Sequence, residues 1–301
     1  MYNKDKKKMK RLSRKKLFPY WLLLPSIIIL LALTVFPVIY SFVLSFQSFD
    51  TFGQLTGFAG LSNYKNVLID SKFWNSVWVT FFLTVSVVII EVIIGLLLAI
   101  IMRDDSKFML YFRWIFIIPM IIAPLVVGIM FRLMFNRDMG VINYMLESVG
   151  LGSVNWLGDP SLAVISIMIV DVWQWTPMVF LILLAGLQSM PQDPIEAARL
   201  DGASKLQIFR DMTIPLLKPI LVVAIIMRTM DALRMFDTMY ILTSGGPGRA
   251  TEVISYLMYE SALHFSKYGY ANAGLIIVFI ITMILSYYLI RLMRTNSQNE
   301  R

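Results

Sequence analysis

The chain has 301 residues, of which 58% are hydrophobic and only 15% are charged, and its formal net charge is +8. This composition is too apolar for a soluble domain of that length and predicts an integral membrane protein. The absence of cysteine excludes disulfides and thiolate metal sites. We predict neither a metal site nor nucleic-acid binding, because retention of positive charge on the cytosolic side explains the basic segments.

A basic tail, residues 1–18, opens the chain and precedes a long apolar run. The run is far longer than a signal-peptide core, and no A-x-A cleavage site follows it. We therefore expect it to remain in the mature protein as the first membrane span. Pro25 and Pro37 lie within the run and predict a bent span.

Six apolar stretches are long enough to cross a hydrocarbon core of about 30 Å, which takes about 20 helical residues. The predicted spans are residues 19–46, 77–102, 110–134, 162–186, 219–243 and 272–293. They predict an all-α integral membrane fold with one transmembrane domain over 19–295, followed by a short tail at 296–301. The fifth span is the least clean because it carries charged side chains.

Lysine and arginine are distributed unevenly between the loops. Most of the 27 lie in the N-terminal tail, the 103–113 turn, the 187–218 loop and the C-terminus. Because cytoplasmic loops retain positive charge, both termini and the 187–218 loop are predicted to face the cytosol. The predicted outer loops are residues 47–76, 135–161 and 244–271.

Charged side chains inside the spans are costly in hydrocarbon and usually face a partner or a water-filled path. In the fifth span, four of them recur every three residues with alternating sign, and each can reach the next on the helix. They are Arg228, Asp231, Arg234 and Asp237. Glu91, in the second span, is interpreted as structural because nothing near it in the sequence supports a site.

The centre of the fourth span reads D-V-W-Q-W-T-P and places Asp171, Gln174 and Trp175 on one helix face. Polar groups beside an indole suit a sugar, whose hydroxyls need donors and acceptors while its C–H face can stack. The same side chains can instead brace neighbouring helices, and both interpretations stay open. The candidates for the substrate path are Asp171, Gln174, Trp175, Arg228, Asp231 and Met235.

The predicted cytosolic loop contains two helix-start signals. Asp193 can cap a helix with Pro194 at its first position, and Glu196 completes a D-x-x-E capping box. Gly202 is predicted to end that helix after about two turns.

A second start follows, with Ser204 as the cap and Gln207 three residues later, and Pro215 and Pro219 are predicted to close the unit before the next span. The loop is therefore predicted to form a short helix-turn-helix.

The spacing of this loop resembles the signature of the membrane subunits of bacterial ATP-binding-cassette importers: E-A-A, three residues, G, nine residues, I-x-L-P. The matching residues are Glu196, Ala197, Ala198, Gly202 and Pro215, with Met212 and Ile214 as conservative replacements. The resemblance implies that the loop is a coupling helix that docks in a cleft of the ATPase. Arg199 and Asp201 add charge to the docking surface.

Other phrases resemble the maltose-type carbohydrate permeases that pair as two unlike subunits, with this chain in the place of the first. They are F-A-G-L-S-N-Y at Phe58–Tyr64, W-L at Trp156 and Leu157, and F-D-T-M-Y-I-L-T-S-G-G-P at Phe236–Pro247. The resemblance implies half of a sugar path that works by alternating access. It also implies sugar contacts near five of the substrate-path candidates: Asp171, Gln174, Trp175, Arg228 and Met235.

The implied partners are a second related permease subunit, two copies of a cytosolic ATPase, an external sugar-binding protein and membrane lipid, in the bacterial cytoplasmic membrane. We expect a non-catalytic chain that binds no cofactor, with ATP and Mg²⁺ held by the ATPase. One alternative is an ion-coupled sugar carrier in which Glu91, Asp171 or Asp231 takes up protons. Others are an importer of a sugar phosphate or polyol and a membrane scaffold.

Overall fold

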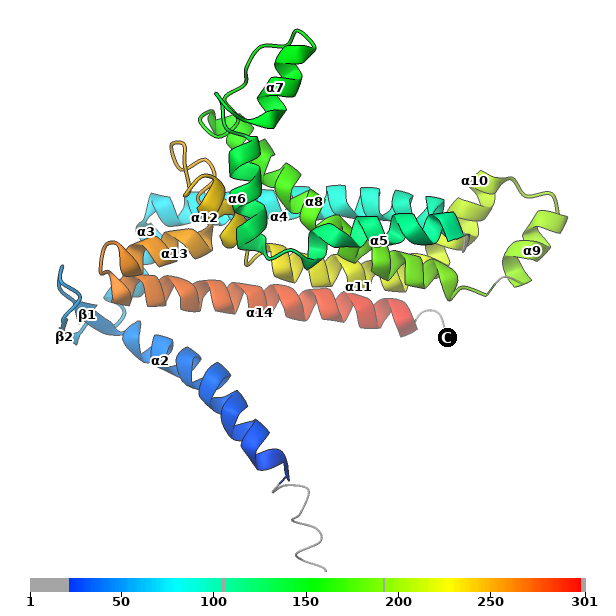
Figure 1. The fold of residues 1–301 in the computed structure, drawn as a ribbon. Helices are drawn as coiled ribbons and strands as arrows, with labels where there is room; N and C mark the ends of the chain where they lie inside the picture. Colours follow the sequence, from blue (N-terminus) through cyan, green and yellow to red (C-terminus); the bar gives the residue numbers. More distant parts are fainter. Residues whose placement is uncertain (1–21, 104–106, 192, 299–301) are drawn as a thin grey trace, which may run out of the picture.

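The computed structural model describes residues 22–103, 107–191 and 193–298. Over these residues, five helices are long and apolar enough to cross a membrane, or six if one bent pair counts as a single span. The spans lie side by side in an elongated bundle, except for the first, which diverges from it (Figure 1). The predicted tail at 1–18 lies outside the described residues, as do residues 299–301.

The first span, Leu22–Leu44, contains a π-helical turn at Leu31–Val35 before α2 at Phe36–Leu44. Pro37 lies at the start of α2, and a π turn is one of the local adjustments by which a helix accommodates a proline. The loop that follows the span forms an antiparallel hairpin of β1 (Gln47–Phe49) and β2 (Leu55–Phe58), and then α3 (Ser62–Ile69). The sequence signals did not predict this hairpin.

The second and fourth spans form the centre of the bundle. They are α4 (Ser71–Ile101) and α8 (Pro160–Gln188), which pack along each other. Both begin at an aspartate whose side chain accepts backbone N–H groups: Asp70 accepts from Lys72, and Asp159 from Ser161 and Leu162. These caps explain why α4 begins six residues before the predicted 77.

The third predicted span, 110–134, is not one continuous helix. It consists of α5 (Lys107–Ile121) and α6 (Pro124–Met134), bent by 96° at the break. Pro124 has no N–H and pushes Ala123 out of the helical region, to ψ 135°. Beyond α6, α7 (Val141–Ser148) projects from the bundle (Figure 1).

The fifth predicted span, 219–243, was wrong at both ends. One helix runs from Lys205 to Ala232, through α10 (Lys205–Ile208), the π turn η2 (Phe209–Thr213) and α11 (Ile214–Ala232). The π turn lies directly before Pro215 and accommodates it, so the predicted break at Pro215 does not occur.

The chain leaves the helix after Ala232 and forms a separate α12 (Asp237–Leu242), which packs against α6. Its side chains belong to the apolar core shared by α4, α6, α8 and α13, where Met239 is fully buried beside Phe131 and Phe135. Two further helices follow it, α13 (Ile254–Leu263) and α14 (Tyr268–Gln298).

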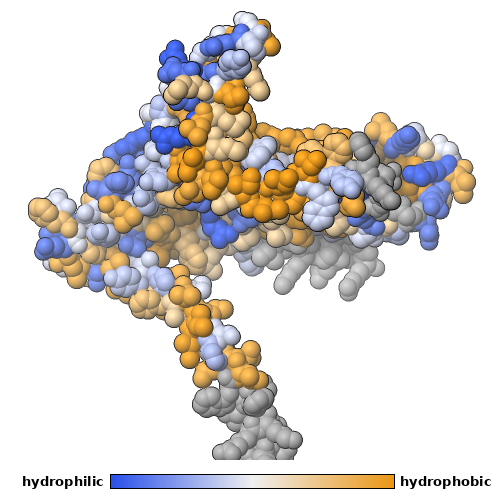
Figure 2. Space-filling model, in the orientation of Figure 1, coloured by the Kyte–Doolittle hydropathy of each residue, from blue (hydrophilic) through white to orange (hydrophobic). Residues whose placement is uncertain are grey.

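The loops alternate between the two ends of the bundle. The β1–β2 hairpin and the α12–α13 connection lie at one end, while α9 (Asp193–Leu200), α10 and the end of α14 lie at the other (Figure 1). Figure 2 shows hydrophobic residues gathered over α5 and the adjoining bundle, with hydrophilic residues at the α7 tip and at the α9–α10 end. This distribution fits a membrane protein with polar ends.

Candidate functional site

Three helices of the bundle meet at a buried cluster of charges. Arg228 of α11 donates from Nε to Glu91 Oε2 of α4 at 2.6 Å, and from a terminal nitrogen to Asp171 Oδ2 of α8. The three side chains are at most 4% exposed. The guanidinium also lies over the Trp175 ring, 5.5 Å from its centroid. One cation therefore ties three spans together through two carboxylates and one aromatic face.

Gln174 lies one turn further along α8 and reaches the break in the third span. Its Nε2 donates to the Ile122 carbonyl oxygen at 3.0 Å, so the amide satisfies a backbone group that the α5–α6 bend leaves without a helical partner. Glu91 Oε1 and Gln174 Oε1 are buried and have no hydrogen-bond partner among the described residues. The buried charge cluster and Gln174 thus contain two acceptor oxygens to which no described residue donates a hydrogen bond.

The predicted charge ladder of the fifth span is divided between two environments. Arg228 pairs with Glu91 and Asp171 instead of Asp231. Asp231 pairs with Arg234 at 3.1 Å, and their side chains are 42% and 75% exposed, respectively.

The last ladder residue, Asp237, begins α12 beyond the break. Met235, also beyond α11, is packed in the core. Of the six predicted path residues, the structure therefore brings Asp171, Gln174, Trp175 and Arg228 together and separates Asp231 and Met235 from them.

Glu91 is the member of the cluster that the sequence interpretation placed outside the site. Its neighbours in the sequence are apolar, and the partner that explains its burial is 137 residues away. The usable signal was the sign of its charge, because a buried carboxylate in one span and a buried guanidinium in another can neutralise each other. Sequence distance alone concealed this pair.

Arg234, the exposed arginine of the Asp231–Arg234 pair, lines a groove between the end of α11 and α14, whereas Asp231 is not among its lining residues. The groove has a volume of about 680 Å³ and is mostly apolar, with Thr229, Leu233 and Arg234 on the α11 side. Thr282 and Ser286 add hydroxyl groups from α14. Exposed charge in a membrane span requires water or a protein partner, so this face of α11 is poorly suited to lipid.

The α9–α10 unit forms a second candidate site, at one end of the bundle. Ala203 N–H donates to the Ala198 carbonyl oxygen and closes α9, and Gly202 takes the left-handed conformation at φ 85°. Ser204 and Gln207 form the predicted capping box, with bonds of 2.8 and 3.3 Å. The predicted turn at Gly202 and the predicted Ser204–Gln207 capping box are therefore present, whereas the Asp193–Glu196 capping box stays a prediction.

The surface of this unit is open. Leu200 is 89% and Leu206 is 73% exposed, although both lie in a polar setting. The exposed members of the predicted coupling set are Glu196, Ala197, Arg199, Asp201, Gly202 and Pro215, and Ala198 is half-buried. Ile195 of α9 is buried. Large exposed apolar side chains among charges are typical of a protein-binding surface.

Comparison with known proteins decides the family. Residues 91–298, more than half of the chain, match the family described as binding-protein-dependent transport system inner membrane component. The chain belongs to this permease family. The predicted resemblance to importer permeases is thereby confirmed, and the permease is a multi-pass membrane protein.

Relatives of the permease include sugar transport proteins. It is 41% identical over 264 residues to the trehalose/maltose transport system permease protein MalF of Thermococcus litoralis, over 88% of the permease and 89% of the relative. It is 32% identical over 301 residues to the sulfoquinovosyl glycerol transport system permease protein SmoG of Agrobacterium fabrum, over 98% of both.

Among solved structures, the fold is shared with a bacterial ABC transporter involved in the import of the acidic polysaccharide alginate. The TM-score is 0.83 over 95% of the permease and 98% of that chain, at 22% identity.

Proposed function

We propose that the permease is one of two related membrane subunits of an ATP-driven carbohydrate importer, and that α9 and α10 couple it to a cytosolic ATPase. The observation that carries this proposal is the exposed pair Leu200 and Leu206 on a unit with an intact capping box and an E-A-A sequence. A rigid helical unit that binds the ATPase through exposed leucines and charged side chains can pass a movement of the ATPase on to the membrane helices. A flexible loop would change its own shape instead.

The orientation is part of the proposal. The α9–α10 end would face the cytosol, where ATP and Mg²⁺ are bound by the ATPase subunits and not by this chain. The hairpin end would face the binding protein that delivers the sugar. The excess of lysine and arginine in the segments predicted to be cytosolic, which include the 187–218 loop, supports this arrangement.

The proposed sugar path runs along the exposed face of α11. Asp231 offers an accessible carboxylate there, whereas Arg228, Asp171 and Gln174 are sealed from solvent in this conformation. We assign the sealed residues to bracing the three helices and Asp231 to direct contact with a sugar hydroxyl. The names of the relatives, which include transporters of trehalose, maltose and several other sugars, support a carbohydrate as the substrate class.

Coupling is tested by copurification and uptake with the full transporter. Leu200→Arg changes an exposed tip without disturbing the core, and it is expected to lose the ATPase from the complex and to abolish ATP-dependent uptake. Glu147→Lys, on the exposed surface of α7, is the matched control and should retain both.

Retention of the ATPase and of uptake in the Leu200→Arg variant would contradict the coupling role. Uptake driven by a proton gradient without any ATPase would instead support the ion-coupled carrier, which the family assignment does not favour.

A further inference from the structure

Over its described residues, the first span is attached to the bundle only near the end that precedes β1. Every residue from Leu22 to Tyr40 is exposed, and the burial begins at Ser41, Leu44 and Ser45. Figure 1 shows α2 leaving the rest of the chain beside the start of α14 and the β1–β2 hairpin. Packing against the described residues of its own chain therefore does not set the direction of this span. Within the chain, the residues around the end that precedes β1 must do so.

Asn63 of α3 caps the end of the span. Its Nδ2 donates to the Ser45 carbonyl oxygen at 2.9 Å and to the Gln47 carbonyl oxygen at 2.8 Å. Carbonyl groups at the end of a helix lack intrahelical donors, and a single amide here satisfies one in the cap and one in the following strand. The same side chain thereby fixes how the chain turns from α2 into β1.

Tyr64 holds the same point from the neighbouring position. Its hydroxyl lies 2.6 Å from Ser45 Oγ, and Ser45 is fully buried. Its ring packs against Phe46, with ring centroids 5.3 Å apart. Both Asn63 and Tyr64 belong to the F-A-G-L-S-N-Y phrase, which the proposed transport and coupling roles leave without a function.

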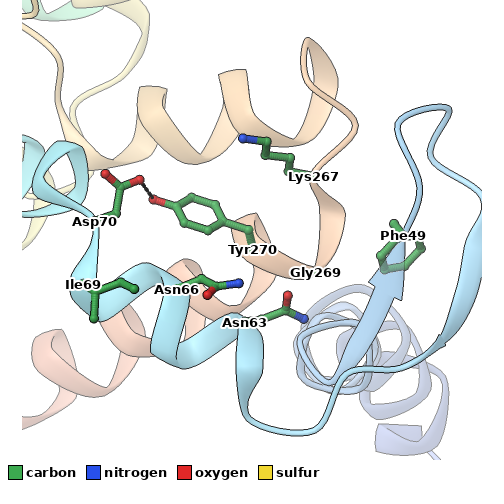
Figure 3. A pocket seen from close by; sticks show the side chains of 8 residues that line it. All are labelled: Phe49, Asn63, Asn66, Ile69, Asp70, Lys267, Gly269 and Tyr270. Atoms are coloured by element: carbon green, nitrogen blue, oxygen red, sulfur yellow. Dashed lines mark hydrogen bonds between the residues drawn. The ribbon is translucent and has the colours of Figure 1, made fainter.

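Gly269 brings α14 against this cap. A Cβ atom at this position would overlap the Gln47 carbonyl oxygen and would lie 2.5 Å from Asn63 Nδ2. Figure 3 shows Asn63 and Gly269 close together and Phe49 on the neighbouring strand. All three line a cavity of about 510 Å³, together with Asn66 and Lys267. The absence of a side chain at position 269 thus lets the start of α14 lie against β1 and the Asn63 cap.

We propose that Asn63, Tyr64 and Gly269 form a clasp that sets the direction in which the first span leaves the bundle. The clasp joins the end of the first span to the beginning of the last through α3. With the clasp formed, the first span keeps one fixed orientation relative to the bundle. Without it, the span would be joined to the bundle only by the chain and could take many orientations. The proposal does not depend on the transported molecule or on the ATPase.

The direction of the span can be measured because the chain has no native cysteine. Spin labels at Ile28→Cys on the first span and Met283→Cys on α14 lie at exposed positions. In the full chain in lipid nanodiscs, pulsed electron spin resonance is expected to give one narrow distance distribution. Asn63→Ala and Gly269→Val are each expected to broaden it at least twofold.

Asn66→Ala is the matched control, because Asn66 lies on the same helix and lines the same cavity but makes no hydrogen bond to the end of the span among those of the described residues. It should leave the distribution narrow.

Tyr64→Phe provides a milder test if the other variants fold poorly, since it keeps the ring and removes only the hydroxyl contact with Ser45. A broad distance distribution between the two spin labels in the protein with an unchanged clasp would overturn the proposal. The proposal would also be overturned if the distance distributions of the Asn63, Gly269 and Tyr64 variants were no wider than that of Asn66→Ala.

Discussion

Arg228 Nε and Glu91 Oε2 lie 2.6 Å apart, although 137 residues separate them in the sequence. Asp171 completes the contact from a third helix. A guanidinium is suited to this position because its planar set of donors serves two carboxylates at once, which a lysine cannot do with the same geometry. The ion pairs therefore hold α4, α8 and α11 at a common level while leaving the exposed face of α11 open.

Removal of the guanidinium is expected to destabilise the permease strongly. In Arg228→Met, two buried carboxylates lose their cation, which typically costs about 3–5 kcal/mol. The measurement is thermal unfolding of the purified chain in nanodiscs. The double variant Arg228→Met with Glu91→Gln should recover part of the loss, because it removes one of the two uncompensated charges.

Arg234→Gln is the control for that experiment, since it breaks an ion pair of the same kind on the same segment but with side chains that are 42% and 75% exposed. Solvent-exposed pairs contribute only about 0–1 kcal/mol. An equal loss of stability in Arg228→Met and Arg234→Gln would show that burial does not distinguish the two pairs.

Gly202 is expected to be intolerant of a side chain even though it has free space around it. No atom lies within 4 Å of a Cβ built there, so a steric clash is excluded, but φ is 85°. An L-residue in the left-handed region costs roughly 1–2 kcal/mol. Gly202→Ala should therefore raise the hydrogen-exchange rates of α9 amides. Ala203→Gly, which lacks the positive φ, is the comparison, and equal rates in the two variants would contradict this explanation.

Local signals in the sequence were sufficient for the caps and for the existence of the spans. Ser204 and Gln207 are three residues apart, and Gly202 follows a short helix, so their structural roles depend on near neighbours. The Glu91–Arg228 contact and the end of α11 depend on packing between distant segments. The residues of α12 are largely apolar because they enter the core shared with α4, α6, α8 and α13. A hydropathy profile therefore joined two helices that the tertiary structure separates.

Asp231→Asn is expected to reduce sugar uptake mainly through a higher KM, with little change in stability. The carboxylate is partly exposed and its only ion-pair partner among the described residues is Arg234, so the loss of the pair should have a small effect on folding. Loss of one charged hydrogen bond to a substrate hydroxyl corresponds to about 1.5–3 kcal/mol, or roughly 10- to 100-fold in KM. Uptake kinetics in proteoliposomes with the complete transporter measure this change. An unaltered KM in Asp231→Asn would show that Asp231 does not contact the sugar. Lys218→Gln, at an exposed position at the other end of α11, serves as the control.

Glu252 is expected to make stability fall as pH rises. Its carboxylate is only 4% exposed and lies beside Ser76 at 3.3 Å and Arg249 at 3.8 Å. Burial raises the pKa of Glu252 above the ordinary value of 4.5, and this effect outweighs the opposing attraction of Arg249. The folded chain therefore keeps the proton at pH values at which the unfolded chain has released it. The contribution to stability is complete below about pH 4.5 and declines as pH rises through the folded pKa.

Glu252→Gln should flatten this dependence, because glutamine resembles the protonated carboxyl and does not titrate. Melting temperatures measured between pH 4 and pH 9 are expected to converge for the two proteins at low pH, with the variant higher at high pH. Glu147→Gln on exposed α7 should follow the unmodified chain throughout, since no burial acts on that carboxyl. If the Glu252→Gln variant instead loses stability at high pH, attraction by Arg249 outweighs burial. The ionised carboxylate would then be the form that fixes the α12–α13 connection to α4.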